Sequence, residues 1–168
     1  MDVPFLLRLY DHMEWGDALL WSTVLAMEAA AADDFVMDSI VHLHLVQRAY
    51  LNLWRGEQIV PVGKDDFDSP SDARDWAREF YPAVRDFMAE APPERLDEEI
   101  DTPWRSFIDE RIGGPIAMAT LRDMAFQVAS HSVHHRAQIN RRIRELGGEP
   151  PFIDYIGWVW SGCPDPEW

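Results

Sequence analysis

The chain has 168 residues, 47% of them hydrophobic, so it is long enough and apolar enough to fold as one domain around a sizeable core. Its formal net charge of -15 repels phosphate groups, which excludes nucleic acids and anionic membranes as partners held by charge. The N-terminal stretch "MDVPFLLRLYDHMEW" fits neither a signal peptide nor a membrane span, and the single cysteine, Cys163, excludes an intrachain disulfide. We therefore expect a soluble cytoplasmic protein with no nucleic acid and no membrane partner.

Two long helices are predicted in the N-terminal third of the chain. Apolar residues recur at helical spacing from about Val3 to Ala32, a segment that includes the strong helix-forming run "AMEAAAA". A second periodic segment runs from about Asp34 to Gly56, where the glycine is a natural C-terminal stop.

Two further helices are predicted in the remainder. The third begins at a Ser/Asp cap near Ser69 and ends before Pro92, and Pro82 inside it should bend or weaken one turn. Residues 96–114 show no helical period and are expected to form a short irregular hairpin. The fourth helix begins near Thr120, where "TLRD" is similar to a capping box, and ends at the glycines of "ELGG".

Four helices of roughly 20 to 30 residues with short connections are what an antiparallel four-helix bundle requires. The predicted fold is therefore all-α, a single domain over residues 1–168. It has a short irregular insert before the last long helix and an aromatic, proline-rich C-terminal tail that has room for a short helix.

The stretch "HSVHH" in the fourth helix holds three histidines that point in different directions. Because each residue of an α-helix turns by about 100°, the neighbours of a side chain indicate its face. His135 projects within the apolar stripe and His131 along its edge, whereas His134 points among polar side chains toward solvent. His131 and His135 thus form an inward i,i+4 pair, and two imidazoles one turn apart can reach a single cation.

The same reasoning places a histidine on the inner face of each of the first two helices. His42 lies in the middle of an apolar stripe and is predicted to face the core, whereas His44 is predicted on the opposite side, near Gln47 and Arg48. On the first helix His12 lies among apolar residues.

Converging imidazoles favour a shared metal, because one ion satisfies a nitrogen on each ring that would otherwise be buried unpaired. We predict His42, His131 and His135 as metal ligands, with His12 as a hydrogen-bonding neighbour of the site or a substrate contact. The alternative is that these histidines bind nothing and only pack, as single inward histidines usually do.

Three segments carry a family resemblance that covers almost the whole chain. "LYDHMEWGDALLWSTV" is similar to a first helix built around an aromatic residue, Trp-Ala-Asn and leucines, and "SIVHLHLVQRAYLNLWRG" to a second helix with a histidine before a polar-Arg-x-aromatic-Leu run. "HSVHHRAQINRRIRELGGEPPFIDYIGW" is similar to His-x-x-x-His-Arg-Gly-Gln followed by Leu-Gly and an Asp-containing tail. The chain thus resembles the DinB/YfiT-like four-helix-bundle proteins, described as metalloenzymes of the DinB superfamily.

The resemblance puts the family's ligand positions at His42, His131 and His135. Departures from the pattern are Ala137 in place of glycine, Gln127 where a histidine is often found, and His12 in place of the first-helix aromatic residue.

The resemblance implies an up-down-down-up bundle with one divalent metal at one end of the core, held by three histidines. Three neutral imidazoles leave a coordination position open, which favours catalysis or ligand capture over a structural role. Zinc is the expected metal, and nickel, iron and manganese also suit imidazole.

The family includes transferases in which a low-molecular-weight thiol is activated at the metal, so thiol-dependent S-transferase chemistry on a small-molecule substrate is the leading prediction, with metal-dependent hydrolysis as a variant. Arg136 or Arg55 is a candidate to hold a carboxylate of the thiol, the alternative being that both are solvated surface charges. No HExxH motif supplies a general base, for which Asp154 and Glu57 are candidates by chain position only.

A second class of function is a non-catalytic metal-binding module that acts in stress response or interaction. Such a module could be a homodimer joined through aromatic helix faces. Trp158 and Trp160 of the C-terminal tail are candidates to cover that interface or to close the pocket.

Overall fold

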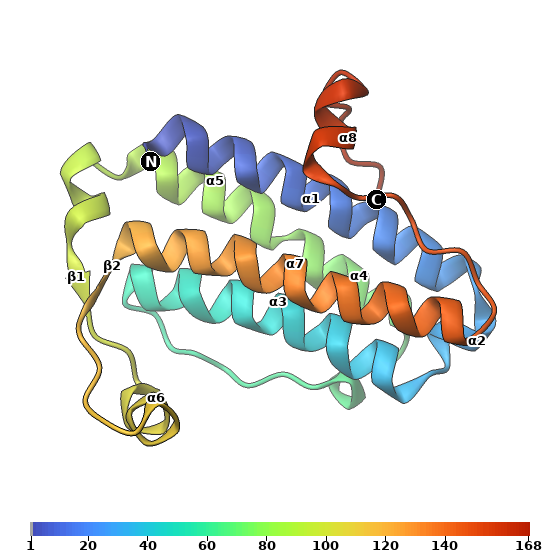
Figure 1. The fold of residues 1–168 in the computed structure, drawn as a ribbon, viewed down its shortest axis with the longest axis horizontal. Coiled ribbons are helices and arrows are strands. Elements are labelled where there is room, and N and C mark those ends of the chain that lie inside the picture. The colour runs from blue at the N-terminus through green and yellow to red at the C-terminus, as the bar shows by residue number, and fades with distance from the viewer. Residues whose placement is uncertain (1) are drawn as a thin grey trace.

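Four helical rods form the bundle of the computed structural model, which describes residues 2–168 (Figure 1). They are α1 (Val3–Ala26), α3 (Asp34–Arg55), the consecutive pair α4 (Pro70–Arg78) and α5 (Phe80–Glu90), and α7 (Leu121–Glu145). In Figure 1 α1 and α7 run in one direction and α3 and the α4–α5 pair in the other, which confirms the up-down-down-up order. The connection from α3 to α4 is long, because two successive parallel rods require the chain to return along the whole bundle (Figure 1).

The ends of the helices follow from local residues. Thr120 and Asp123 form the predicted capping box at the start of α7, and Gly56 ends α3 in the left-handed conformation with φ of 71°. The first predicted helix is interrupted, because Met27 is extended and separates α1 from the short α2 (Glu28–Ala31).

Pro82 interrupts the third rod as its sequence predicts. A proline has no N–H for the carbonyl four residues earlier, which here belongs to Arg78, and its ring crowds that carbonyl. The helix accordingly stops at Arg78 and restarts at Phe80, with Glu79 as the junction.

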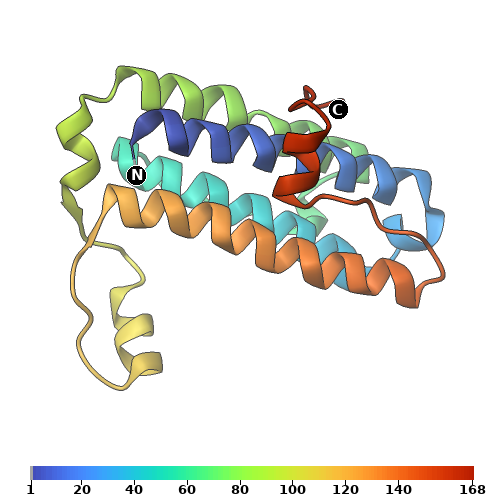
Figure 2. The same ribbon diagram turned by 45° about the horizontal axis from the view of Figure 1, so that its top comes forward.

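The insert before α7 contains a helix that the sequence pattern did not indicate. Strands β1 (Glu99–Ile100) and β2 (Ala119–Thr120) pair antiparallel, and α6 (Arg105–Ile112) lies between them on an arm that projects from the bundle (Figures 1 and 2). No side chain of α6 is buried, and every residue of this helix is described, so it shows no apolar stripe for the core. The remaining elements are α8 (Tyr155–Trp160) in the tail and the 3-10 helices η1 (Lys64–Asp66) and η2 (Pro93–Asp97).

The buried apolar residues form two clusters, one toward each end of the bundle. On α1, for example, Leu6, Tyr10 and Met13 belong to the first cluster, and Trp21 and Val24 to the second. A layer of buried polar side chains separates the clusters at mid-length. Within residues 2–168, no helix combines the length and apolar character that crossing a membrane needs.

Candidate metal centre

Three histidines from the two adjacent helices α3 and α7 converge in the structure. His42, His131 and His135 each offer a ring nitrogen, and these three nitrogens lie within 4.8 Å of one another. The Nε2 atoms of His131 and His135 are 3.1 Å apart, and the His42 ring centroid lies 5.4 Å from that of His131 and 4.9 Å from that of His135. The convergence expected from the sequence is present.

The face of α3 that carries His42 was assigned incorrectly from the sequence. His42 is exposed, whereas His44, predicted to point outward, is 1% exposed and lies in the core. The apolar residues around His42, including Leu45 and Val46, are only partly buried and line an open cavity. The apolar stripe around His42 therefore forms the wall of a pocket. The face of α3 that does point into the core contains polar residues, so its apolar residues do not show a clear helical period.

The cluster also lies elsewhere along the bundle than the resemblance implies. His131 and His135 are in the middle of α7, and His42 is in the first half of α3. The histidines therefore occupy the groove between α3 and α7 near mid-length, beside the polar layer of the core, and not one end of the core.

The donor set fits a divalent ion. Two nitrogens bound tetrahedrally at the usual Zn–N distance of about 2.0–2.1 Å are separated by about 3.3 Å, close to the 3.1 Å between His131 and His135. Burial, aided by the charges of the neighbouring imidazoles, lowers the pKa of His131 to about 4, and burial also lowers the pKa of His135. Both rings are therefore neutral at pH 7, as metal ligation requires.

Without an ion the pair is incompletely satisfied. In the hydrogen bond between the two Nε2 atoms, one ring is the donor and the other is the acceptor. The Nδ1 atoms of both His131 and His135 are buried and have no hydrogen-bond partner among residues 2–168. The ring that accepts at Nε2 must carry its proton on Nδ1, so at least one buried N–H lacks an acceptor. If the histidines only packed in the structure, the energetic cost of this buried, unpaired N–H would have no explanation.

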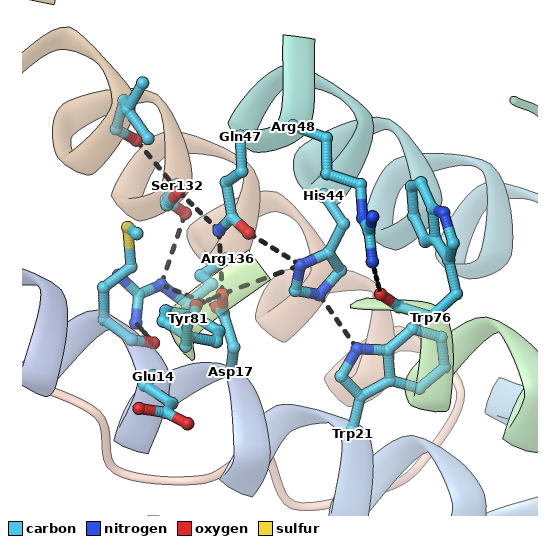
Figure 3. A network of polar contacts seen from close by, with 12 residues as sticks. Glu14, Asp17, Trp21, His44, Gln47, Arg48, Trp76, Tyr81, Ser132 and Arg136 are labelled. Carbon is cyan, nitrogen blue, oxygen red and sulfur yellow. Dashed lines mark hydrogen bonds and ion pairs between the residues drawn. The ribbon is translucent and has the colours of Figure 1, made fainter. Parts of the chain in front are cut away.

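A hydrogen-bonded layer in the core ties α1, α3 and α7 together (Figure 3). The Trp21 indole donates to Nε2 of His44 at 2.9 Å, so the His44 proton is on Nδ1 and is donated to Oε1 of Gln47 at 2.8 Å. The Gln47 amide in turn donates to Asp17 at 2.9 Å and to Ser132 at 3.1 Å. Because burial lowers the pKa of His44, this ring stays neutral within the chain of hydrogen bonds.

Asp17 is a fully buried carboxylate of the layer, and the buried Arg136 guanidinium balances its charge. Nε of Arg136 lies 3.6 Å from Asp17, and the Tyr81 hydroxyl donates to the same carboxylate (Figure 3). Burial and the Asp17 charge hold the pKa of Tyr81 well above its ordinary value, so the phenol keeps its proton. Gly16 allows this arrangement, because a Cβ at that position would lie 2.0 Å from Nη1 of Arg136.

The polar layer was missed from the sequence, although a signal was present. Buried residues recur along α1, α3 and α7 at intervals of three or four positions, as at positions 125, 128, 132, 136, 139 and 143 of α7. Each series is interrupted by polar residues near its middle, and these face one another across the core. They are Asp17, His44, Gln47, Ser132 and Arg136.

The structure does not bring the other predicted site residues to the histidine cluster. His12 is buried as expected, but its Nε2 donates to the Ile153 carbonyl at 3.0 Å, and its ring packs against Trp15, Tyr155 and Trp158. It thereby attaches the C-terminal segment to α1.

The two arginines have different environments. Arg136 is 2% exposed, so it is no surface charge, and it shares a cavity with His12 on a different face of α7 from His131. Arg55 is exposed in the last turn of α3, where it donates to the Ala83 carbonyl at 2.7 Å. The proposed bases Asp154 and Glu57 are both exposed.

Trp158 and Trp160 of α8 differ in their surroundings. Trp158 is 4% exposed beside His12 and donates to the Pro164 carbonyl at 3.1 Å, whereas Trp160 is 79% exposed. Neither tryptophan lines the cavity that opens beside His42.

The family model of the DinB family matches residues 6–165. The chain belongs to the DinB family. The match spans the bundle, the insert and most of the C-terminal tail of this DinB protein, so it covers all of the elements that carry the three histidines. Among curated proteins no sequence matches the chain.

Proposed function

We propose that this DinB protein is a metal-dependent enzyme whose divalent ion is held by His42, His131 and His135. The observation that carries the proposal is the convergence of three ring nitrogens within 4.8 Å from two helices. Three imidazoles leave coordination positions free, and such open sites are typical of catalysis, whereas structural zinc sites are normally closed by four protein ligands. Zinc is the first choice, with nickel, iron and manganese as alternatives.

Thiol-dependent transfer is the leading reaction, and hydrolysis is its variant. A bound divalent ion supplies Lewis-acid chemistry that lowers the pKa of a thiol or a water. A thiol activated in this way needs no separate general base, and among the described residues that line the neighbouring cavity there is no Asp or Glu to serve as one.

A second cavity near the cluster, lined by two arginines and Glu145, offers an anionic thiol a more accessible guanidinium than the surroundings of Arg55 or Arg136. Gln138 and Arg142, which follow His135 on the same face of α7, line a cavity of about 490 Å³ with Arg141. Arg142 is paired with Asp33 at 2.7 Å, whereas Arg141 is 83% exposed and pairs with Glu145 at 2.9 Å. We propose Arg141 as the contact for a carboxylate of the thiol.

Metal analysis of untagged protein by mass spectrometry tests the site. We expect about one divalent ion per chain, with a loss of at least tenfold in His42→Ala and in His131→Ala. The matched control is His134→Ala, because His134 is exposed on the same helix and outside the cluster. Wild-type protein that binds no divalent ion when Zn²⁺ is supplied would refute the proposal.

Turnover separates an enzyme from a metal-binding module. Metal-loaded protein is incubated with glutathione or cysteine and the electrophile monochlorobimane, and conjugate formation is followed by fluorescence. Activity that His135→Ala abolishes supports the enzyme, and an Arg141→Glu variant should raise KM for glutathione with little change in kcat. Tight metal binding without turnover across a wider panel of thiols and electrophiles would instead favour a non-catalytic stress-response or interaction module, including a homodimer.

A further inference from the structure

A cavity of about 420 Å³ opens directly beside the histidine cluster, within the usual size range for small-molecule sites. His42 and His131 form part of its wall. Four separate segments supply the rest, namely α3, α7, the α3–α4 connection and the arm that carries α6. The residues that the argument uses are Ala49, Tyr50, Trp104, Phe107, Ile108 and Gln127.

The lining is aromatic and aliphatic and carries no formal charge. Apart from the two histidines, the polar side chains among its described residues are Tyr50 and Gln127. The ring centroids of Tyr50 and Trp104 lie 5.2 Å apart at 70°, an edge-to-face contact that joins the arm to α3. Away from the histidines, an anionic or cationic group entering here would lose its hydration without gaining a charged partner.

The arm places apolar side chains over this cavity, and none of the residues of its helix α6 is buried in the core of the bundle. Phe107 on α6 is 57% exposed yet lines the cavity, and Ile108 beside it is only half-buried. The arm is braced internally, since Arg105 donates to the Ile116 carbonyl at 3.0 Å and Asp109 accepts from the Ile116 amide at 2.7 Å. Together with the Tyr50–Trp104 contact, these bonds order the aromatic face of the arm beside the cavity.

From this lining we propose that the cavity binds an uncharged substrate with an aromatic or aliphatic body, whose reactive end reaches the His42, His131 and His135 cluster. The identity of the site as a reaction centre rests on the proposed function, whereas binding in the cavity does not. The Gln127 amide, one turn before His131, orients a polar substituent of the substrate. The charged co-substrate binds outside this cavity.

Binding is tested first with metal-free protein, using 2-naphthol as the uncharged probe and 2-naphthalenesulfonate as its anionic counterpart in isothermal titration calorimetry. We expect one site for 2-naphthol and at least tenfold weaker binding of the sulfonate. Absence of 2-naphthol binding, or equal affinity for the two probes, would overturn the proposal.

Substitutions in the cavity wall, on α6 and α3, locate the bound probe. Phe107→Asp places a carboxylate in the cavity wall and should weaken 2-naphthol binding at least tenfold, and Ala49→Trp should do the same by filling the cavity from α3. The matched control is Ile112→Asp, because Ile112 is 70% exposed on the same helix and outside the lining, and it should change the affinity less than twofold. Equal effects of Phe107→Asp and Ile112→Asp would place the probe elsewhere and refute the assignment.

Proximity to the histidines is tested with Mn²⁺-loaded protein and a fluorinated naphthol. We expect strong broadening of the ¹⁹F signal of the bound probe. The control is His131→Ala, which should no longer hold the ion, so that this broadening disappears. If the protein binds one Mn²⁺ and the signal stays narrow, the cavity does not open onto the cluster and the inference is wrong. If no ion binds but the naphthol results hold, the proposed metal-dependent function fails while the apolar binding site stands.

Discussion

Gln47 is the junction of the polar layer, and its replacement by leucine tests whether that layer stabilises the bundle. Leucine has a similar volume, so Gln47→Leu removes hydrogen bonds without leaving a large cavity. His44 loses the acceptor of its buried N–H at 2.8 Å, and Asp17 loses an amide donor at 2.9 Å. Ser132 loses only a donor at 3.1 Å and still donates to the Val128 carbonyl.

The magnitude follows from these partners. An unsatisfied buried N–H costs about 1–3 kcal/mol, and a hydrogen bond lost from a charged group costs about 1.5–3 kcal/mol. We therefore expect the free energy of unfolding of Gln47→Leu to fall by about 2.5–6 kcal/mol. With a urea m-value of about 2 kcal/mol/M, the unfolding midpoint should fall by about 1.2–3 M.

Urea unfolding at pH 7, followed by tryptophan fluorescence, measures this change. The control is Gln127→Leu, an exposed glutamine of α7, which should change the free energy of unfolding by less than about 0.5 kcal/mol. A loss below about 1 kcal/mol in Gln47→Leu would show that the hydrogen bonds of the layer contribute little, and the reasoning would be wrong.

Two further substitutions test a helix cap and a close contact. Asp33→Ala removes the N-cap of α3 and the pair with Arg142, so we expect a loss of about 1–2 kcal/mol at pH 7 by urea unfolding. The Arg142 hydrogen bond lowers the pKa of Asp33, so the contribution is fully present above the unfolded-state pKa of about 3.9 and is lost as pH falls through the lower folded-state value. A difference between the two proteins that does not narrow as the pH is lowered below about 3.9 contradicts this. Gly16→Ala should destabilise by about 1–3 kcal/mol in a thermal melt by forcing Arg136 from its buried position, whereas Gly114→Ala, where a Cβ would meet nothing within 4 Å, should not; equal melting temperatures would refute the steric argument.

The ends of the helices are local features, and the sequence determined them well. The capping box of Thr120, the stop at Gly56 and the break before Pro82 depend on hydrogen bonds and backbone angles within a few residues. The arm helix α6 was missed because it packs on no core face, so no apolar period marks it. The i,i+4 spacing selected His131 and His135, and the apolar stripe of α3 together with the family resemblance selected His42, although that stripe does not face the core.

The side of α3 that faces the core depended on the other helices. Both faces of α3 carry apolar side chains, and periodicity alone chose the one around His42, which forms the wall of an open cavity. The other face contains His44 and Gln47, which look suited to solvent until Asp17 of α1 and Ser132 of α7 supply their partners. A polar side chain can be buried only when distant segments satisfy its hydrogen bonds, so the tertiary structure alone decided that these residues are inside.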